Sequence, residues 1–374
     1  NLKNSLKIKF EQKIHKVYYF LNFLFFNFLK ILFYPFTHKN KYIFYKPYFG
    51  SLKNTIKFIL KLRDIPIKYS FSFFDNFRVR KNISFKLRSE FSVETKTKDI
   101  REKITRLLVA ECMPTIYLEG FSNLKRISNN CYLPKKSKVI VTFNSWRDNI
   151  FKFWLSNQVN NGAKLIYGQH GAGYGTNLKH YAERHELKIC DTYLSWGWKG
   201  NSDKIYPVGD FSSFNKKDFK YVKNKKILIV AGNINIYKVH NIILNKNEVI
   251  LREQQMNSLL SLLDYRRIGS IDLKEHPNDK RRDTSIRKVI QSKKIKINII
   301  KYKNNFDNLI NNYEFLIFPY QFATPFLKYL SLNKTCLSFF DLRYIDDNFK
   351  KDFTPLFDNN ILHTSSEKMS NFIN

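Results

Sequence analysis

KVIVTF (138–143), DNIFKFWLSNQVNNG (148–162) and KLIYGQH (164–170) follow one another in the chain and decide its fold. The outer two are short apolar runs, typical of buried strands. Between them, apolar side chains recur at helical spacing: Ile150, Phe151, Trp154, Leu155 and Val159. Asp148 suits the N-cap of this helix, and Gly162 suits its C-terminal end. A strand, a helix and a strand in this order predict a βαβ unit and a parallel sheet.

Short apolar runs and helical patterns alternate in the same way over most of the chain after residue 110. Further apolar runs in the first half predict strands at 114–120, 192–197 and 204–209. A second series of apolar runs predicts strands at 225–233, 270–276, 296–300, 315–320 and 334–341. Helical patterns lie near 247–265 and over 322–333 in this second half. We therefore predict an α/β protein with two parallel sheets.

The polar and basic stretch 210–224 reads as a linker between two domains. A length of 374 residues also favours two domains over one. We expect an acceptor-side domain over 1–210, which begins with an aromatic and basic segment, and a donor-binding domain over 225–345. A tail, 346–374, is expected to pack back on the first domain.

The composition favours a polyanionic neighbour. The chain has 65 basic and 31 acidic residues, a formal net charge of +34. Nucleic acid, anionic lipid and phosphorylated substrates all fit this charge. The basic residues are spread along the chain, and no known nucleic-acid-binding motif is found, so we expect a membrane surface and a phosphate-bearing substrate rather than a specific nucleic acid. The four cysteines form no CxxC pair, which predicts a reducing compartment and neither a metal site nor a disulfide framework.

An aromatic segment near the start of the chain leaves three readings open. VYYFLNFLFFNFLKILFY (17–34) is apolar but is interrupted by Asn22, Asn27 and Lys30. It could be a buried helix that covers a domain, a helix that lies on a lipid surface, or a membrane span. The interruptions make the span the weakest of the three.

The stretch after the strand at 164–168 holds the first candidate site. Gln169 and His170 are followed by GAGYG (171–175), which contains three of the chain's twelve glycines. Ligands of open α/β sheets bind at the carboxyl ends of strands, and glycines let the backbone approach a ligand closely. The spacing is not that of a dinucleotide-binding loop. An ordinary glycine turn with a structural histidine is the alternative.

Acidic residues and histidines continue in the next segment, YAERHELKICDTYLSWGWKG (181–200). Glu183 and Glu186 lie close enough in sequence to the glycine loop to supply a general base. The alternative is a solvated, charged helix face, which such a pattern also produces.

A second candidate site lies in the second half. Lys274, His276 and Pro277 follow an apolar run, so they are expected at a strand end, where the histidine could donate to an oxyanion. Thr324 is expected at a helix start with Pro325 at the first helical position, an arrangement that suits either phosphate or an ordinary N-cap. Asp346 and Asp347 read as a surface turn rather than a metal-binding pair.

Several of these motifs resemble a known family. FKFW (151–154), GQHGAGYG (168–175), the pair Glu183 and Glu186, and CDTYLSWGW (190–198) resemble the LIC12162 family of surface-carbohydrate transferases. The family usually reads GGGYG where this chain has Ala172. The QHG element is more distantly similar to capsule-type Kdo transferases. The resemblance implies two Rossmann-like domains in the GT-B glycosyltransferase arrangement.

The resemblance also implies roles for the candidate residues. The catalytic candidates are His170, Glu183 and Glu186. The substrate-binding candidates are Gln169, Gly171, Gly173 and Asp148. The donor-nucleotide-binding candidates are Lys274, His276, Pro277 and Thr324. The first three are similar to the HP elements of sialyltransferases and polyol-phosphate transferases, and Thr324 resembles a helix start that family members carry.

We therefore expect a metal-independent glycosyltransferase without a resident cofactor. Its expected partners are a nucleotide-activated donor, such as a CMP-linked ulosonic acid, and a glycan or lipid-linked acceptor. It is expected in the cytoplasm, peripheral on the inner face of a bacterial membrane. The alternatives are a CDP-activated polyol-phosphate transferase, a UDP- or GDP-hexose glycosyltransferase and a non-catalytic polyanion-binding protein.

Overall fold

A computed structural model describes most of the chain after residue 97 and parts of the chain before it. The described residues are 42–45, 57, 61, 67–69, 82–91, 98–130, 133–145, 148–178, 180–210, 218–232, 246–275, 297–300, 306–321 and 323–374. The aromatic segment 17–34 lies outside these residues. Among the described helices, none has the length and apolar character that crossing a membrane requires.

The first sheet has six strands in the order β2-β1-β3-β4-β5-β6. Their bounds are β1 Tyr42–Tyr45, β2 Ile67–Tyr69, β3 Val139–Thr142, β4 Lys164–Gly168, β5 Thr192–Ser195 and β6 Ile205–Pro207. Strand β3 pairs in parallel with both β1 and β4, and Ile140 lies opposite Leu165 in the register with β4. The predicted βαβ unit is therefore confirmed.

Helix α6 (Asn149–Asn160) connects β3 to β4 and buries the apolar face that its sequence pattern predicts. Phe151 and Trp154 are buried there, and the ring of Phe151 stacks on Tyr45 of β1 at a centroid distance of 3.5 Å. The helix begins as predicted, because the carboxylate of Asp148 accepts the backbone N–H of Phe151 at 3.0 Å. Further helices of the first half are α3 (Phe85–Phe91), α4 (Ile100–Cys112), α5 (Phe121–Asn129) and α7 (Tyr181–Ile189).

The second sheet also has six strands, in the order β12-β11-β10-β7-β8-β9. Their bounds are β7 Lys226–Val230, β8 Ser270–Lys274, β9 Asn298–Ile300, β10 Phe315–Phe318, β11 Cys336–Phe339 and β12 Leu362–His363. All of its adjacent strands pair in parallel. The helices described in this half are α8 (Lys246–Leu262), α10 (Phe306–Leu309), α11 (Thr324–Leu330), α12 (Asp347–Asp358) and α13 (Ser366–Ile373).

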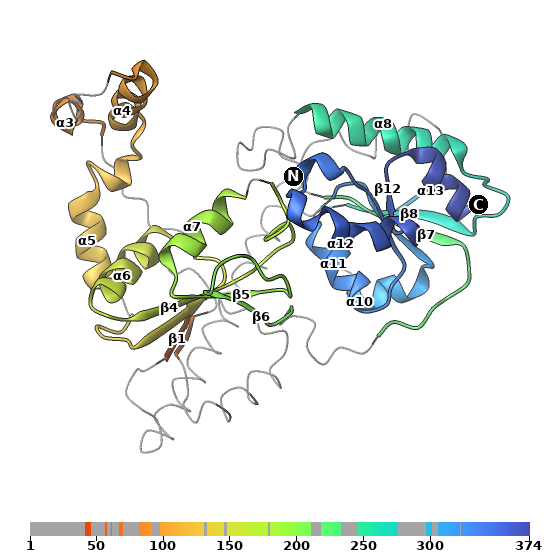
Figure 1. The fold of residues 1–374 in the computed structure, drawn as a ribbon, viewed down its shortest axis with the longest axis horizontal. Helices are drawn as coiled ribbons and strands as arrows, with labels where there is room; N and C mark the ends of the chain where they lie inside the picture. The colour runs from red at the N-terminus through yellow and green to blue at the C-terminus, as the bar shows by residue number, and fades with distance from the viewer. Residues whose placement is uncertain are drawn as a thin grey trace, which may run out of the picture. The chain divides into compact units, whose positions relative to one another are not determined.

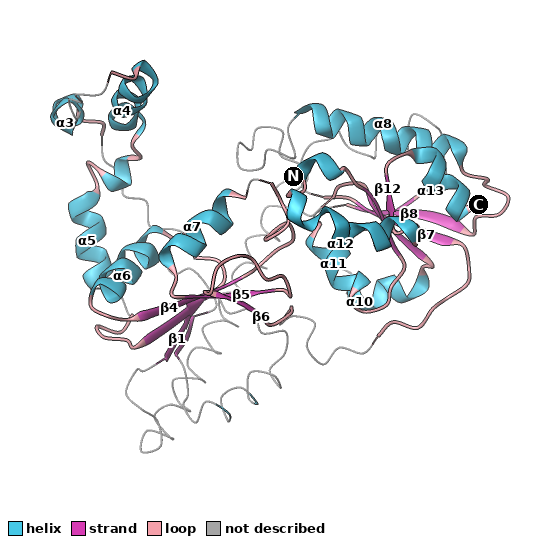
Figure 2. Cartoon of the chain, in the orientation of Figure 1, coloured by secondary structure: helices cyan, strands magenta, loops and turns pink. Residues whose placement is uncertain are grey.

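Helices cover both faces of the second sheet (Figures 1 and 2). Ile227 and Ile229 of β7 belong to the core on one face, whereas Leu228 belongs to the core on the other. Successive side chains of a strand point to opposite faces, so a strand that is apolar throughout must be covered on both. The α/β class and the two parallel sheets are thus confirmed.

Three features differ from the sequence-based expectations or add to them. The predicted strand at 114–120 is wrong, because Thr115–Tyr117 forms a 3-10 turn. Strands β1 and β2 lie before residue 110, where the sequence analysis predicted no strand. The tail, expected to pack on the first domain, contributes Met369 and Ile373 to the core of the second sheet.

The described chain forms two compact units. One comprises 1–168 and 189–193, and the other comprises 169–188 and 194–374. The second unit therefore contains the glycine loop and α7 together with the second sheet. The predicted linker at 210–224 stays a prediction.

Candidate active site

The glycine loop starts directly after β4 and is shaped by the side chain of Gln169. This side chain is 2% exposed. Its amide nitrogen donates to the carbonyl of Gly171 at 2.7 Å. Its amide oxygen accepts the backbone N–H of Trp196 and the indole N–H of Trp198, both at 2.8 Å. Gln169 thus fixes the loop against the segment after β5, which favours a positioning role over the predicted direct contact with substrate.

Two glycines of the loop have backbone conformations that other residues rarely adopt. Gly173 has φ +86° and Gly175 has φ +77°. A Cβ on Gly173 would lie 2.6 Å from the side-chain nitrogen of Asn177, and a Cβ on Gly175 would lie 2.1 Å from the indole ring of Trp198. Both positions therefore require glycine for close packing of the loop.

Tyr174 connects two of the predicted catalytic residues. Its hydroxyl lies 3.1 Å from Nδ1 of His170 and 3.4 Å from a carboxylate oxygen of Glu186. Glu186 is 1% exposed, whereas His170 is half-buried. The same hydroxyl lies 3.4 Å from Nε2 of His170, so Nδ1 is the nearer ring nitrogen. A phenol that donates to Glu186 can accept the Nδ1–H of His170, and in that tautomer Nε2 is the nitrogen that takes a proton.

Glu183 has a different role from Glu186. Its carboxylate accepts the backbone N–H of Gly175 at 2.5 Å, so it holds the second half of the loop. Burial raises the pKa of Glu183, although the Gly175 amide opposes this shift. Glu183 and Glu186 are three residues apart on α7, which places them one helical turn apart on neighbouring positions facing the loop.

The loop also contacts the elements that follow β10 and β11. The backbone N–H of Ala172 donates to Oγ1 of Thr324 at 3.2 Å. Asn177 forms an antiparallel bridge with Ile345, flanked by backbone bonds from Leu178 to Tyr344 and from Asp346 to Thr176, both at 2.9 Å. The structure therefore brings Thr324 to the glycine loop that follows His170, although the sequence assigned the loop and Thr324 to two separate sites.

Thr324 lies at a helix start, as predicted, and Asp346 and Asp347 lie where a helix begins. Helix α11 begins at Thr324, with Ala323 as its N-cap residue and Pro325 as its second residue. Asp346, which we expected in a surface turn with Asp347, is the N-cap of α12.

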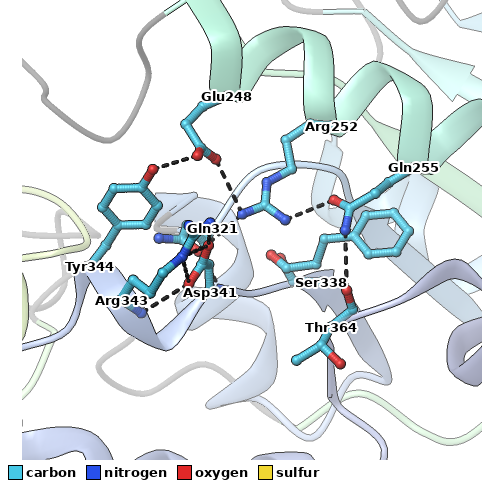
Figure 3. A network of polar contacts seen from close by, with 10 residues as sticks. Glu248, Arg252, Gln255, Gln321, Ser338, Asp341, Arg343, Tyr344 and Thr364 are labelled. Carbon is cyan, nitrogen blue, oxygen red and sulfur yellow. Dashed lines mark hydrogen bonds and ion pairs between the residues drawn. The ribbon is translucent and has the colours of Figure 1, made fainter.

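A buried polar network, absent from the sequence analysis, supports the segment that meets the loop (Figure 3). The hydroxyl of Tyr344 donates to Glu248 of α8, and Glu248 lies 3.5 Å from the guanidinium of Arg252. Arg252 is 3% exposed, and it donates to Gln255 at 2.7 Å and to Gln321 at 3.5 Å. Burial lowers the pKa of Arg252, while Glu248 opposes this shift. Glu248 and Arg252 are four residues apart on α8, a spacing that exposed ion pairs on helices also show. The sequence therefore did not indicate that this pair is buried.

The other predicted residues are not brought to this loop by any described contact. Lys274 ends β8, is 6% exposed, and has a pKa lowered by burial. His276 and Pro277 lie outside the described residues. One carboxylate oxygen of Asp148 accepts the backbone N–H of Phe151, and the other accepts the hydroxyl of Tyr45. These contacts do not favour the predicted contact of Asp148 with substrate, which stays a prediction. In the described part of the chain, no three His, Cys, Asp or Glu side chains gather as a metal site would require.

The fold and the loop together define an α/β protein with a histidine–tyrosine–glutamate chain at the carboxyl end of a parallel strand. A family model described as LIC12162 family transferase matches residues 1–374. The chain belongs to this family and is a transferase, which confirms the resemblance seen in the loop and after it. The resemblance to Kdo transferases is not confirmed.

Solved structures give weaker likenesses. An S. aureus MnaA–UDP co-structure is 14% identical, with 89% of this chain and 87% of that chain covered and a TM-score of 0.46. A putative UDP-N-acetylglucosamine 2-epimerase from Listeria monocytogenes is 11% identical, with 90% and 87% covered and a TM-score of 0.44. A Thermobaculum terrenum O-GlcNAc transferase mutant is 10% identical, with 90% and 59% covered and a TM-score of 0.41. No curated protein matches the chain. The fold therefore rests on the strand pairing described above.

Proposed function

We propose that the chain is a glycosyltransferase that moves a sugar from a nucleotide-activated donor to a hydroxyl of a glycan or lipid-linked acceptor. The observation that carries this proposal is the contact chain His170–Tyr174–Glu186, placed directly after β4. A half-buried imidazole with an orienting hydroxyl nearer to one of its nitrogens is suited to general base catalysis. Transferase membership of the whole chain supports the reaction class.

In the proposed reaction, Nε2 of His170 takes the proton of the acceptor hydroxyl. The acceptor oxygen forms the new bond to the anomeric carbon, and the bond from that carbon to the donor phosphate breaks. The phosphate leaves with the electron pair. Tyr174 and Glu186 hold the imidazole and stabilise the imidazolium that forms, as the phenol oxygen keeps its Nδ1–H bond.

The donor site is proposed in the second half of the chain. Lys274 can offer a positive charge to the leaving phosphate, because pairing with an anion offsets the burial that lowers its pKa. His276 and Pro277 follow it in sequence, and Thr324 touches the glycine loop. We propose that these groups act without a metal and that the donor is a CMP-linked ulosonic acid, on the likeness of the QHG element.

The donor proposal is tested by calorimetry of the whole chain with CMP, CDP, UDP and GDP. Binding of CMP that Lys274→Met weakens supports the proposed donor site. Binding of UDP or GDP alone would replace the donor and keep the reaction, whereas CDP alone would favour polyol-phosphate transfer. Binding of none of the four would favour a non-catalytic polyanion-binding protein.

The catalytic proposal is tested by release of free nucleotide from the donor that calorimetry identifies. His170→Ala is expected to lower the rate by about 10²–10⁴-fold, the usual contribution of a general base. Tyr174→Phe keeps the ring and removes the hydroxyl, so a smaller loss of about tenfold is expected. His185→Ala is the matched control, because His185 is exposed on α7. Unchanged turnover in His170→Ala would overturn the assignment.

We also propose that the protein works at the cytoplasmic face of a membrane, held peripherally. The net charge of +34 supports attraction to anionic lipid.

A further inference from the structure

Trp196 follows directly after β5, next to the segment that carries the candidate base His170. The backbone N–H of Gln169 donates to the carbonyl of Leu194 at 2.9 Å, so the pairing of β4 with β5 continues past the end of β4. The backbone N–H of Trp196 then donates to the side-chain oxygen of Gln169 at 2.8 Å. Because His170 follows Gln169 directly and paired strands lie about 4.8 Å apart, the backbones of His170 and Trp196 leave the sheet side by side.

The side chain of Trp196 differs from those of the other two described tryptophans. The indole N–H of Trp154 donates to a backbone carbonyl at 2.9 Å, and that of Trp198 donates to Gln169 at 2.8 Å. The indole of Trp196 is partly exposed and, among the described residues, has neither a hydrogen-bond acceptor nor an aromatic partner. A Cβ on the next residue, Gly197, would meet no atom within 4 Å, so the space beside Trp196 is open. The free indole therefore points to a partner from outside the chain.

An accessible indole beside a general base suits a sugar ring. One face of a pyranose carries C–H groups that pack on an aromatic ring, and its rim carries hydroxyls that can accept an indole N–H. A nucleobase also stacks on tryptophan. In a nucleotide-activated sugar, however, the ribose and the phosphate separate the base from the anomeric carbon that reacts. A ligand group next to His170 is therefore the sugar and not the base.

We propose that Trp196 is the side chain on which a pyranose ring stacks while the reacting atom of that sugar lies at His170. The inference rests on the proposed function, in which His170 is the base, and it adds a sugar-binding residue to that function. The ring belongs to the acceptor glycan or to the donor sugar, which offer the same chemistry to an indole. Trp198 is not suited to this role, because its N–H is bound to Gln169 and its ring packs on Gly175.

The test measures sugar binding by the full chain and its variants. Saturation-transfer difference NMR with the methyl glycosides of glucose, galactose and N-acetylglucosamine probes the acceptor sugar. Calorimetry probes the donor sugar, as the gain in affinity from CMP to CMP-N-acetylneuraminic acid and from UDP to UDP-N-acetylglucosamine.

Two variants of Trp196 separate the aromatic face from apolar packing. Trp196→Leu keeps an apolar side chain but removes the ring and its N–H, so the affinity for sugar should fall about tenfold or more. Trp196→Phe keeps a ring, so its loss should be smaller. Tyr206→Leu is the matched control, because Tyr206 is an aromatic residue that is 55% exposed on β6. Thermal unfolding of each variant distinguishes lost binding from lost folding, and Trp196→Phe carries the test if Trp196→Leu unfolds.

Each outcome supports or overturns the role of Trp196. Weaker binding of the glycosides assigns the stacked ring to the acceptor, and loss of the gain from nucleotide to nucleotide sugar assigns it to the donor; both support the proposal. Three results would overturn it: a wild-type chain that binds none of the sugar probes, a folded Trp196→Leu that binds them like wild type, or an equal loss of affinity for CMP and UDP themselves. Failure of the proposed function appears elsewhere, as unchanged turnover in His170→Ala, which these binding measurements do not use.

Discussion

At the residue scale, His180 is a functional neighbour that the sequence analysis did not select. It directly precedes α7, and its Nδ1 accepts the backbone N–H of Glu183 at 3.1 Å. Its ring lies 4.0 Å from the ring of Tyr174. Burial lowers the pKa of His180 to about 4, so the ring is neutral at physiological pH and can keep this contact.

The depressed pKa predicts a loss of stability in acid. The unfolded chain binds the proton below its ordinary pKa of 6.5, whereas the folded chain resists it until about 4. The contribution of His180 is therefore complete above pH 6.5 and is lost as the pH falls from there to about 4. With screening of the partly exposed ring, the expected loss is on the order of 2 kcal/mol.

His180→Asn tests this prediction, because asparagine is a favourable N-cap residue that does not titrate. The free energy of unfolding, measured by urea denaturation between about pH 7.5 and about pH 4.5, should fall less steeply in the variant than in wild type. Equal slopes would show that other groups cause the acid dependence.

Replacing Gly175 by alanine is expected to cause a steric clash in addition to backbone strain. Alanine there would meet the indole of Trp198 in addition to adopting a positive φ. Gly175→Ala should lower the free energy of unfolding by about 2–4 kcal/mol. Gly197→Ala is the matched control, since Gly197 also has a positive φ but has nothing within 4 Å of the added Cβ, and should cost about 1 kcal/mol. Thermal unfolding measures both, and equal losses would contradict the packing of Trp198 on the loop.

At the element scale, α3 and α4 depend on one buried ion pair. The side chains of Arg88 and Glu119 are 2% and 4% exposed, and the guanidinium holds the pKa of Glu119 at about 2. Glu119 therefore contributes stability that is complete above its ordinary pKa of 4.5 and is lost as the pH falls toward 2. The link between α3 and α4 should persist through neutral and mildly acidic solution.

Arg88→Met removes the charge while keeping an apolar stem of similar length. It leaves the Glu119 carboxylate and three carbonyls without their donor, so α3 and α4 should open while the sheets stay folded. Hydrogen exchange should rise sharply in α3 and α4 and stay unchanged in α6. Arg106→Met is the matched control, because its ion pair with Glu102 is exposed. Equal exchange in both variants would contradict the central role of Arg88.

Elements with local signals were predictable, and those set by distant contacts were not. The apolar runs at 164–168 and 226–230 are long and clearly bounded, so they read as strands. Strand β1 was missed because its role depends on Tyr45, which packs on Phe151 more than a hundred positions away. The segment 114–120 is apolar like a strand but closes a turn through the bond from Tyr117 to the Pro114 carbonyl.

The candidate site follows the same division. Glu183 and Glu186 were selected because they follow the glycine loop closely in the sequence, and both carboxylates do lie at the loop. Tyr174 was passed over because nothing local shows that its hydroxyl lies between His170 and Glu186. The bond from Ala172 to Thr324 joins positions 152 residues apart, a contact that only the folded chain reveals.

At the scale of the whole molecule, the charge of +34 means that binding to polyanions is expected whatever the site does. Such binding must be distinguished from recognition of a nucleotide, because both involve phosphate. The two differ in how many counterions are released. A DNA duplex on a basic surface releases many counterions, and its affinity falls steeply with salt, whereas a nucleotide held by a few groups releases few.

We therefore predict two different salt dependences for one protein. Between about 50 and about 500 mM salt, affinity for a labelled generic duplex should fall more than about a hundredfold, and affinity for the nucleotide less than about tenfold. Fluorescence anisotropy measures the first and calorimetry the second. Lys274→Met should lower nucleotide affinity and leave the duplex slope unchanged, because one buried lysine is a small part of 65 basic residues. If the affinities for the duplex and for the nucleotide fall equally steeply with salt, the nucleotide binds only as a small polyanion. The charge of the chain would then favour the non-catalytic polyanion-binding protein over a donor site.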